Sequence, residues 1–361
     1  MRHLLDITDL SVEEIEELTR MAEDIAEHPQ KYAESCRGKK LITLFFEPST
    51  RTRMSFEAAM WELGGSVISC TDMSTSSVIK GETLADTMRV VANYADIVAM
   101  RHPYEGAAYV ASLKSPVPVI NAGDGGHCHP TQTLADLLTV HRELGTFDGL
   151  TVGLCGDLKY GRTVHSLINA MLRYKDVKFV LIAPEELKLP EYELDALKRA
   201  GAAYEEVRDL ESAIPSLDVL YMTRVQRERF DDAAVYERVK DCYVLTKEKL
   251  SAAKQKMIVM HPLPRVNEIS SDVDDDPRAA YFRQTMNGKL MRMALILKLL
   301  KEKDGAQPAG GKAWFVGGRC TNRKCITRLE KLPPLYTEEN GVKKCAYCEA
   351  HENIRDKNEG K

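Results

Sequence analysis

The sequence lacks an apolar run long enough to span a membrane, and it lacks a large excess of charge of either sign. No uncharged apolar segment approaches the roughly 20 residues that a bilayer span requires, and the segment Met1–Asp6 lacks the apolar stretch of a secretory signal. Lysine and arginine number 50 and the acidic residues 54, which gives a net charge of -4. We therefore expect a cytoplasmic protein with no membrane partner and no overall positive field for binding nucleic acid.

The common nucleotide-binding loops are missing as well. The sequence contains no Gly-x-x-x-x-Gly-Lys-Ser/Thr segment, and no Gly-x-Gly-x-x-Gly turn follows a predicted strand. These absences exclude the usual phosphate loop and the usual dinucleotide-binding turn. Internal repeats are also absent, so a repeat architecture is not expected.

The length exceeds what one hydrophobic core normally supports, and the composition is that of a globular enzyme. Of the 361 residues, 44% are hydrophobic and 29% are charged, which rules out wholesale disorder. Because single cores stop growing below this length, we expect two or three domains.

From residue 40 onward, short β-branched runs alternate with helix-length segments. Several runs are apolar on both faces, which is typical of strands buried in a parallel sheet. The pattern predicts a doubly wound α/β fold with ligands at the carboxyl ends of the strands, in two four-stranded sheets. The predicted strands are Lys40–Phe46, Ser66–Cys70, Asp96–Met100, Val117–Asn121, Thr151–Cys155, Val177–Ile182, Asp218–Tyr221 and Met257–Met260. The predicted helices are Thr131–Leu144, Arg162–Tyr174, Thr246–Ala253 and a long apolar-periodic segment in Asp275–Leu300.

The first predicted strand leads into a turn that is suited to binding an anion. Pro48 ends the strand, and Ser49 or Thr50 is a good N-cap for the helical segment that follows. Hydroxyls and free backbone N–H groups then lie at the positive end of a helix dipole, beside the guanidinium of Arg51. A polar helix cap with solvated arginines is the alternative, but the strand–turn–helix context favours a phosphate site.

Nine cysteines, an odd number, argue for reduced thiols rather than for a secreted disulfide framework. Four of them lie within the last 42 positions, namely Cys320, Cys325, Cys345 and Cys348. Two thiolate pairs on short turns suit a closed tetrahedral zinc site of the structural kind. Roughly 45 residues bury too small a core, so metal binding would supply folding energy. Unrelated cysteines, or a redox Cys-x-x-Cys without its βαβ context, are the alternatives.

The turn at Ser49, together with four further segments, resembles the aspartate and ornithine carbamoyltransferases. The matching segments, in the order of that family, are Ser49–Arg53, Ser76–Thr83, Arg101–Pro103, His129–Gln132 and His261–Arg265. The resemblance covers roughly residues 1–302 and implies the carbamoyltransferase fold. It implies a carbamoyl-phosphate-binding domain over 1–130, completed by a C-terminal helix over 285–302, and an aspartate-binding domain over 131–284.

Two arginines at neighbouring strand ends favour a dicarboxylic amino acid as the acceptor. Arg162 and Arg224 can each bind one carboxylate, although an isolated arginine is more often a surface ion-pair partner. An ornithine-type site would need acidic groups for the distal ammonium and typically carries cysteine after the histidine, where this chain has Pro262. Lys80 also belongs to the aspartate branch of the family.

The resemblance implies roles for individual residues. The phosphate would be held by Ser49, Thr50, Arg51, Thr52 and Arg101. Thr52, Arg101 and His129 would face the carbonyl oxygen as in an oxyanion hole, with His129 as a polariser rather than a base. The carbamoyl nitrogen would be held by Gln132 and the backbone carbonyls of Pro262 and Leu263, and aspartate by Arg162, Arg224 and Gln226. The departing phosphate can accept the proton of the amine, so no organic cofactor and no protein base are expected.

In the family, Ser76 and Lys80 act in the site of a neighbouring subunit, which implies a homotrimer or a multiple of trimers. Lys80 would reach both substrates, although Ile79 stands where some relatives have a second lysine. The resemblance also implies an early step of pyrimidine biosynthesis.

The C-terminal segment has a resemblance of its own. Gly318–Thr327 and Lys344–Glu349 look like the zinc domain of the aspartate carbamoyltransferase regulatory chain, here joined by a linker over 303–312 to a module over 313–361. The roughly 100-residue nucleotide-binding domain that precedes this domain in the family is missing, so nucleotide control is not implied. We expect one structural zinc ion per chain and docking on a catalytic domain. The rival hypothesis, a nucleic-acid-binding appendage, rests on local basic residues such as Arg319 and Lys343.

Overall fold

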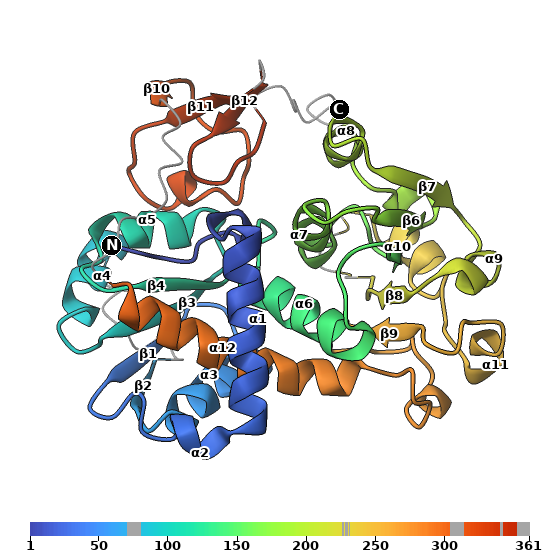
Figure 1. The fold of residues 1–361 in the computed structure, drawn as a ribbon. Helices are drawn as coiled ribbons and strands as arrows, with labels where there is room; N and C mark the ends of the chain where they lie inside the picture. Colours follow the sequence, from blue (N-terminus) through green and yellow to red (C-terminus); the bar gives the residue numbers. More distant parts are fainter. Residues whose placement is uncertain are drawn as a thin grey trace. The chain divides into compact units, whose positions relative to one another are not determined.

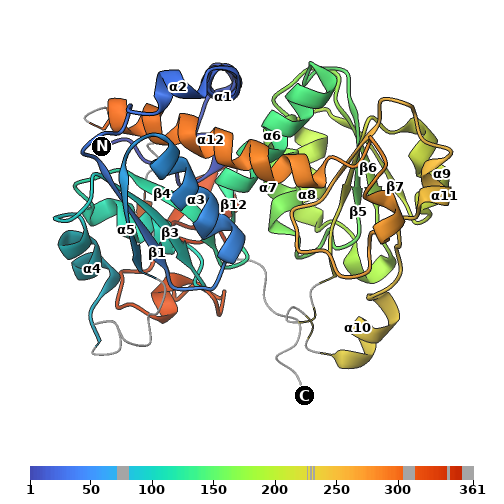
Figure 2. The same cartoon turned by 90° about the horizontal axis from the view of Figure 1, so that it is seen from below.

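The computed structural model describes residues 1–70, 81–225, 227, 230, 232–303, 314–339 and 342–351. Figures 1 and 2 show the fold in two orientations. The chain forms two compact units. Unit 1 contains Met1–Ser11, Arg20–Thr131 and Arg292–Lys361, and unit 2 contains Val12–Thr19 and Gln132–Met291.

Unit 1 is built on a four-stranded sheet in which every pair of neighbouring strands is parallel. Its strands are β1 (Lys40–Phe45), β2 (Ser66–Cys70), β3 (Ile97–His102) and β4 (Val119–Asp124), in the order β2-β1-β3-β4. Five of the six residues of β1 are buried, as the doubly apolar pattern predicted. Helices that lie within this unit are α2 (Pro29–Tyr32), α3 (Thr50–Glu62), α4 (Leu84–Val91) and α5 (Ala107–Lys114), after the short η1 (Ile7–Asp9).

Unit 2 contains a parallel sheet of five strands, where the sequence predicted four. The strands are β5 (Thr151–Cys155), β6 (Lys178–Ile182), β7 (Ala203–Val207), β8 (Val219–Met222) and β9 (Ile258–Met260), in the order β7-β6-β5-β8-β9. The missed strand, β7, is an edge strand without a single buried residue, so it has no apolar pattern. Helices within this unit are α7 (Arg162–Met171), α8 (Glu191–Arg199), α9 (Leu210–Ala213), α10 (Ala233–Val239) and α11 (Lys247–Leu250), with η4 (Glu185–Leu187), η5 (Ile214–Ser216) and η7 (Ser271–Val273).

The three longest helices contribute residues to both units. They are α1 (Val12–Glu27), α6 (Pro130–Leu144) and α12 (Tyr281–Lys301). The long C-terminal helix begins at Tyr281, inside the predicted segment Asp275–Leu300 and four residues before the start at 285 that the resemblance implied. The helix predicted over Thr246–Ala253 is reduced to the single turn of α11, and the helix predicted from Arg162 ends at Met171 rather than Tyr174. Among the described residues, no helix combines the length and the apolar character needed to cross a membrane.

A small antiparallel sheet forms the C-terminal module of unit 1. It contains β10 (Trp314–Val316), β11 (Leu335–Glu339) and β12 (Val342–Cys345), with η8 (Ile326–Arg328) between the first two strands. In Figure 1 this sheet lies next to α5. The predicted fold class, two parallel-sheet α/β domains followed by a small β module with a cysteine cluster, is therefore confirmed.

Each parallel sheet has one point where the order of its strands reverses. In unit 1 the chain leaves β1 toward β2 and then continues on the other side of β1 with β3. In unit 2 it leaves β5 toward β6 and β7 and then continues on the other side with β8. Ligands of doubly wound folds bind outside the carboxyl ends of the strands at such points. The residues at and after the carboxyl ends of β1, β3, β5 and β8 are therefore the candidates for binding ligands.

Candidate functional site

The turn after β1 has the features of an anion site at a helix terminus. Ser49 is the N-cap of α3, and its side chain makes no capping hydrogen bond. The hydroxyl is therefore not used to satisfy the first N–H groups of the 13-residue helix. Arg51 is exposed, whereas Arg53 is directed to Glu57 (Nη1 to Oε1, 3.4 Å) and to Ser69 (Nη1 to Oγ, 3.1 Å). Arg51 is thus the more exposed of the two arginines in this turn.

Arg101 lies on β3, the strand beside β1, at the same edge of the sheet. Its Nη2 is 3.0 Å from Oε2 of Glu47, and its Nη1 donates to the carbonyl oxygen of Ala122 (3.3 Å). Burial lowers the pKa of Arg101, while the negative charge of Glu47 acts in the opposite direction. The backbone N–H of Phe46 donates to the carbonyl oxygen of Arg101 (2.8 Å) and fixes the turn against β3. The structure thus brings Arg101 to the reversal point that also carries Ser49, Thr50 and Arg51.

His129 precedes α6, and it is buried with 5% exposure. Its Nδ1 is 3.3 Å from the hydroxyl of Thr131. Arg292 of α12 donates to that same hydroxyl (Nη2, 3.5 Å) and to Ser55 of α3 (Nη1, 3.1 Å). No motif in the sequence identified Arg292, yet its guanidinium connects the helix that begins after Ser49 with the segment that carries His129.

Three of the predicted site residues lie outside the described part of the chain. They are Ser76, Lys80 and Gln226.

The reversal point of unit 2 is formed by tightly packed turns after β5 and β8. A side chain at Gly156 (φ 111°) would place Cβ 2.5 Å from the carbonyl oxygen of Thr223. The Thr223 hydroxyl accepts from the N–H of Asp157 (2.8 Å) and donates to the carbonyl oxygen of Cys155 (2.9 Å). These contacts join the ends of the two strands.

Both predicted acceptor arginines follow these strand ends. Arg162 is the first residue of α7, after the N-cap Gly161, and Arg224 comes directly after Thr223. Both are partly exposed. Two guanidinium groups at one reversal point suit a ligand with two carboxylates.

The loop after β9 presents the predicted backbone carbonyls of Pro262 and Leu263. His261 is buried, and its Nδ1 accepts from the N–H of Leu263 (2.7 Å). Its proton is therefore on Nε2, which donates to Oε1 of Glu268 (2.7 Å). Burial raises the pKa of Glu268, but hydrogen bonds from His261 and the Val266 N–H outweigh it, and the net shift is downward. Leu263 adopts a left-handed backbone conformation (φ 52°), which this network supports.

The four C-terminal cysteines come together in the module. Cys320 and Cys348 have their sulfurs 3.7 Å apart, Cys325 and Cys345 have theirs 3.8 Å apart, and all four side chains are buried. These distances are far longer than the roughly 2.05 Å of a disulfide. They match the edge of about 3.8 Å expected for a tetrahedron of sulfurs 2.3 Å from a zinc ion. The cluster therefore has the residue types and the spacing to hold a metal ion.

The cysteine module packs on the β3–α5 region of unit 1. The N–H of Glu105 donates to the carbonyl oxygen of Lys324 (2.8 Å), and the N–H of Ile326 donates back to that of Glu105 (2.9 Å). The Glu105 carboxylate accepts from Asn322 (2.6 Å) and from the N–H of Gly126 (3.1 Å). Buried residues of the module and of α5 belong to one hydrophobic cluster. The module thus shares the core of the unit on which it packs.

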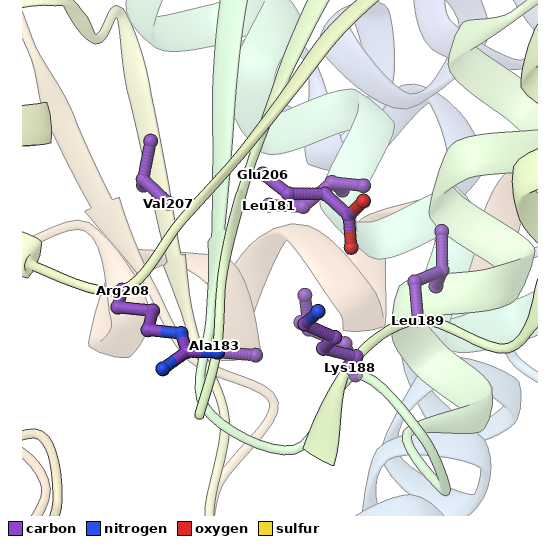
Figure 3. A pocket seen from close by; sticks show the side chains of 8 residues that line it. Leu181, Ala183, Lys188, Leu189, Glu206, Val207 and Arg208 are labelled. Carbon is purple, nitrogen blue, oxygen red and sulfur yellow. The ribbon is translucent and has the colours of Figure 1, made fainter. Parts of the chain in front are cut away.

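A cavity of about 90 Å³ lies near the carboxyl ends of β6 and β7 (Figure 3). Its lining combines apolar side chains with Lys188, Glu206 and Arg208. Lys188 Nζ is 3.0 Å from Oε2 of Glu185, and Arg208 pairs with the same carboxylate. Neither Arg162 nor Arg224 lines this cavity, so it is separate from the predicted acceptor residues.

Comparison with known families accounts for most of the chain. The profile "Aspartate/ornithine carbamoyltransferase, carbamoyl-P binding domain" matches residues 2–142. The profile "Aspartate/ornithine carbamoyltransferase, Asp/Orn binding domain" matches residues 148–299. The cysteine module lies beyond both matches.

Named relatives agree with this assignment. The aspartate carbamoyltransferase catalytic subunit of Lachnoclostridium phytofermentans is 58% identical over 301 residues, which cover 83% of this chain and 98% of the relative. That of Clostridium novyi is 59% identical over 299 residues, with the same coverage.

Solved structures give the same answer. The catalytic subunit of M. jannaschii aspartate transcarbamoylase superposes with a TM-score of 0.79 at 48% identity, covering 85% of this chain and 100% of that one. Aspartate transcarbamoylase from Trypanosoma cruzi in complex with carbamoyl phosphate superposes with a TM-score of 0.78 at 40% identity, covering 82% and 96%. The chain therefore belongs to the aspartate/ornithine carbamoyltransferase family and is similar, over residues 2–299, to aspartate carbamoyltransferase catalytic subunits.

Proposed function

We propose that the protein is an aspartate carbamoyltransferase, which transfers the carbamoyl group of carbamoyl phosphate to the amine of L-aspartate. The products are N-carbamoyl-L-aspartate and phosphate, as in an early step of pyrimidine biosynthesis. The observation that carries this proposal is that each parallel sheet has its own set of anion-binding residues at the point where its strand order reverses. Relatives at 56–59% identity carry the same name.

The residues after β1 and β3 are proposed to bind the donor. The N-terminus of α3 supplies N–H groups and hydroxyls from Ser49, Thr50 and Thr52, and Arg51 and Arg101 supply guanidinium groups for the phosphate oxygens. Because Arg101 pairs with Glu47 in this structure, a bound phosphate competes with that carboxylate for the same guanidinium.

The transfer itself needs polarisation of one carbonyl group. The lone pair of the amine attacks the carbonyl carbon, negative charge develops on the carbonyl oxygen, and the bond from carbon to the phosphate oxygen breaks. Thr52, Arg101 and His129 are proposed to stabilise that oxygen, and loss of one such donor typically raises a barrier by about 2.7–4 kcal/mol. The amine proton goes to the departing phosphate, so His129 is not required as a base.

The residues after β5 and β8 are proposed to select aspartate. Arg162 and Arg224 each bind one carboxylate, and Gln226 completes the set. Ornithine has one carboxylate and a distal ammonium, which two guanidinium groups would repel. An acceptor with a single carboxylate remains the alternative within the same family.

Assembly and the second subunit's contribution follow from the family resemblance. We propose a homotrimer, or a multiple of trimers, in which Ser76 and Lys80 reach a neighbouring site. Three large apolar side chains of unit 1 that are exposed in the single chain support this proposal. They are Met54 and Trp61 on α3 and Ile68 on the edge strand β2. Analytical ultracentrifugation of the purified protein tests this proposal.

We propose that the four-cysteine cluster binds one structural zinc ion. A closed set of four thiolates leaves no position for a substrate, so the metal would stabilise the module and its contacts with Glu105 rather than act in transfer. The residues facing solvent include Arg319, Arg323 and Lys331, so nucleic-acid binding by this module has one supporting observation. Salt-dependent binding of RNA or DNA distinguishes the two roles.

The experiment that tests the function is an assay of carbamoyl phosphate with aspartate, ornithine and other amines in parallel. We expect turnover with aspartate and loss of turnover in Arg51→Ala with the fold retained. Lys31→Ala is the matched control, because it removes an exposed basic residue that pairs with Asp24 on the surface. If every amine is refused, the proposed function is wrong; turnover with ornithine alone would refute the acceptor.

A further inference from the structure

A buried carboxylate in unit 2 collects hydrogen-bond donors from three elements of the fold. Asp136 lies on α6 with 0% exposure. Its Oδ1 accepts from Gln132 Nε2 (2.8 Å) and from Gln284 Nε2 of α12 (2.6 Å). Its Oδ2 accepts from the hydroxyl of Tyr221 on β8 (3.0 Å). No motif in the sequence singled out this residue.

The carboxylate determines which way the two amide side chains face. An ionised carboxylate only accepts hydrogen bonds, so both amides must turn their NH₂ groups toward Asp136. Burial, reinforced by the negative charge of Asp136, raises the pKa of Tyr221, so the phenol keeps its proton and donates as well. The oxygen of each amide is then directed elsewhere as an acceptor.

The two amide oxygens serve different partners. Gln284 Oε1 accepts from the backbone N–H of His261 (3.0 Å) and so fixes the start of the segment that continues to Pro262 and Leu263. Gln132 is only partly buried. Its Nε2 donates to Asp136, and its Oε1 takes no part in that hydrogen bond. The proposed function assigns the carbamoyl nitrogen to Gln132 and to the carbonyls of Pro262 and Leu263. All three of these acceptors are connected to one carboxylate.

We propose that Asp136 is a positioning residue that makes the donor site selective for an NH₂ group on the donor's carbonyl carbon. It holds Gln132 with its oxygen available to the carbamoyl N–H, and through Gln284 and His261 it holds the two backbone carbonyls. The inference rests on the proposed function, because it concerns the donor of that reaction. The group recognised is an amino group with two N–H donors, as distinct from a methyl group of similar size.

Asp136→Asn tests this assignment at nearly unchanged volume. An asparagine can donate as well as accept, so the Gln132 amide is free to turn its NH₂ group toward the substrate. The measurements are kcat/KM for carbamoyl phosphate and the inhibition constant of acetyl phosphate, which carries a methyl group in place of NH₂. We expect kcat/KM to fall by about tenfold or more while the inhibition constant changes by less than about twofold, because an unpaired buried polar group discriminates strongly.

Thr139→Val is the matched control. Thr139 lies one turn further along α6, is equally buried, and its hydroxyl accepts from Asn287 of α12 (3.0 Å), three residues after Gln284. The change therefore removes a buried polar contact between the same two helices without touching the Asp136 network. We expect Thr139→Val to lower the melting temperature. The ratio between kcat/KM for carbamoyl phosphate and the inhibition constant of acetyl phosphate should stay unchanged.

Gln284→Met provides a second variant in case Asp136→Asn does not fold. It removes the bonds to Asp136 and to the His261 N–H, and we expect kcat/KM for carbamoyl phosphate to fall at least about threefold with acetyl phosphate inhibition retained. If folded variants keep the wild-type ratio, or weaken both ligands equally, Asp136 is only structural and the inference is overturned. If the wild-type protein itself does not carbamoylate aspartate, the proposed function is wrong, and this result is distinct from a wild-type ratio in the variants.

Discussion

Gly106 offers a direct test of how the cysteine module packs on its own chain. The residue caps α5 with φ 84°, and a Cβ built there would lie 2.5 Å from the carbonyl oxygen of Tyr347 and 2.6 Å from its carbonyl carbon. Both atoms are backbone, so neither side can move away as a flexible side chain would. Gly106→Ala should therefore force the module away from α5.

The loss of unfolding free energy expected for Gly106→Ala has two parts, which can be measured separately. A left-handed conformation costs alanine roughly 1–2 kcal/mol, and overlap in a packed region typically adds about 1–3 kcal/mol. Gly145→Ala isolates the first part, because Gly145 has φ 75° and nothing within 4 Å of the built Cβ. We expect Gly106→Ala to lose about 2–5 kcal/mol of unfolding free energy and Gly145→Ala only about 1–2 kcal/mol.

Urea unfolding of both variants is the assay, carried out in the full chain and in a chain ending at Lys303. Without the module, Tyr347 is absent and the two substitutions should cost the same. Equal costs in the full chain would show that the module does not occupy this position in solution, and the packing described for Glu105 and Gly106 would be refuted.

Further predictions concern the donor site, the buried pair of His261 and Glu268, and the four clustered cysteines. Arg51→Ala should lower kcat/KM for carbamoyl phosphate by about 100-fold, because a charge-assisted phosphate contact is lost, and steady-state kinetics with circular dichroism as a folding control check this. The folded pKa of Glu268 lies below its ordinary 4.5, so its contribution to stability is present above that pH and is lost as pH falls through the folded value. Unfolding of Glu268→Gln should then depend less on pH in that acidic range than wild type does. Chelation should lower the melting temperature, and Cys345→Ser should abolish binding of one zinc ion per chain while Cys242→Ser, an exposed thiol elsewhere, should not.

The sequence predicted the buried strands well, and the reason is physical. The buried strand β5 and the edge strand β2 have the bounds that were predicted, and the other predicted strands differ by a few residues at their ends. A strand covered on both faces must be apolar at successive positions, as in Leu41–Phe45, and this pattern is visible without any tertiary information. The edge strands β2 and β7 have no buried residue. β2 was still predicted because it contains Val67 and Ile68, whereas Glu205 and Glu206 leave β7 without an apolar run.

In the candidate site, too, some residues could be predicted from the sequence and others could not. Residues near strand ends, such as Ser49, Arg101 and Arg162, were predicted as site residues because their residue types suit anions and their places along the chain match known segments. Asp136 and Arg292 were not found, since an acid or an arginine inside a helix pattern is normally a solvated side chain. Their importance comes from burial beside donors or acceptors, some of which lie more than 100 residues away in sequence.

The residues near strand ends and the buried polar residues between helices have different roles in the proposed reaction. The residues proposed to bind the substrate lie near strand ends, where a parallel sheet brings them together once its strand order is fixed. Their orientation, however, depends on buried polar contacts between helices, as in the pair of α6 and α12. We expect a substitution in such a contact to alter selectivity although every residue proposed to face the substrate stays unchanged. Comparison of Asp136→Asn with Thr139→Val measures that difference, because only the first changes the direction in which an amide faces the donor.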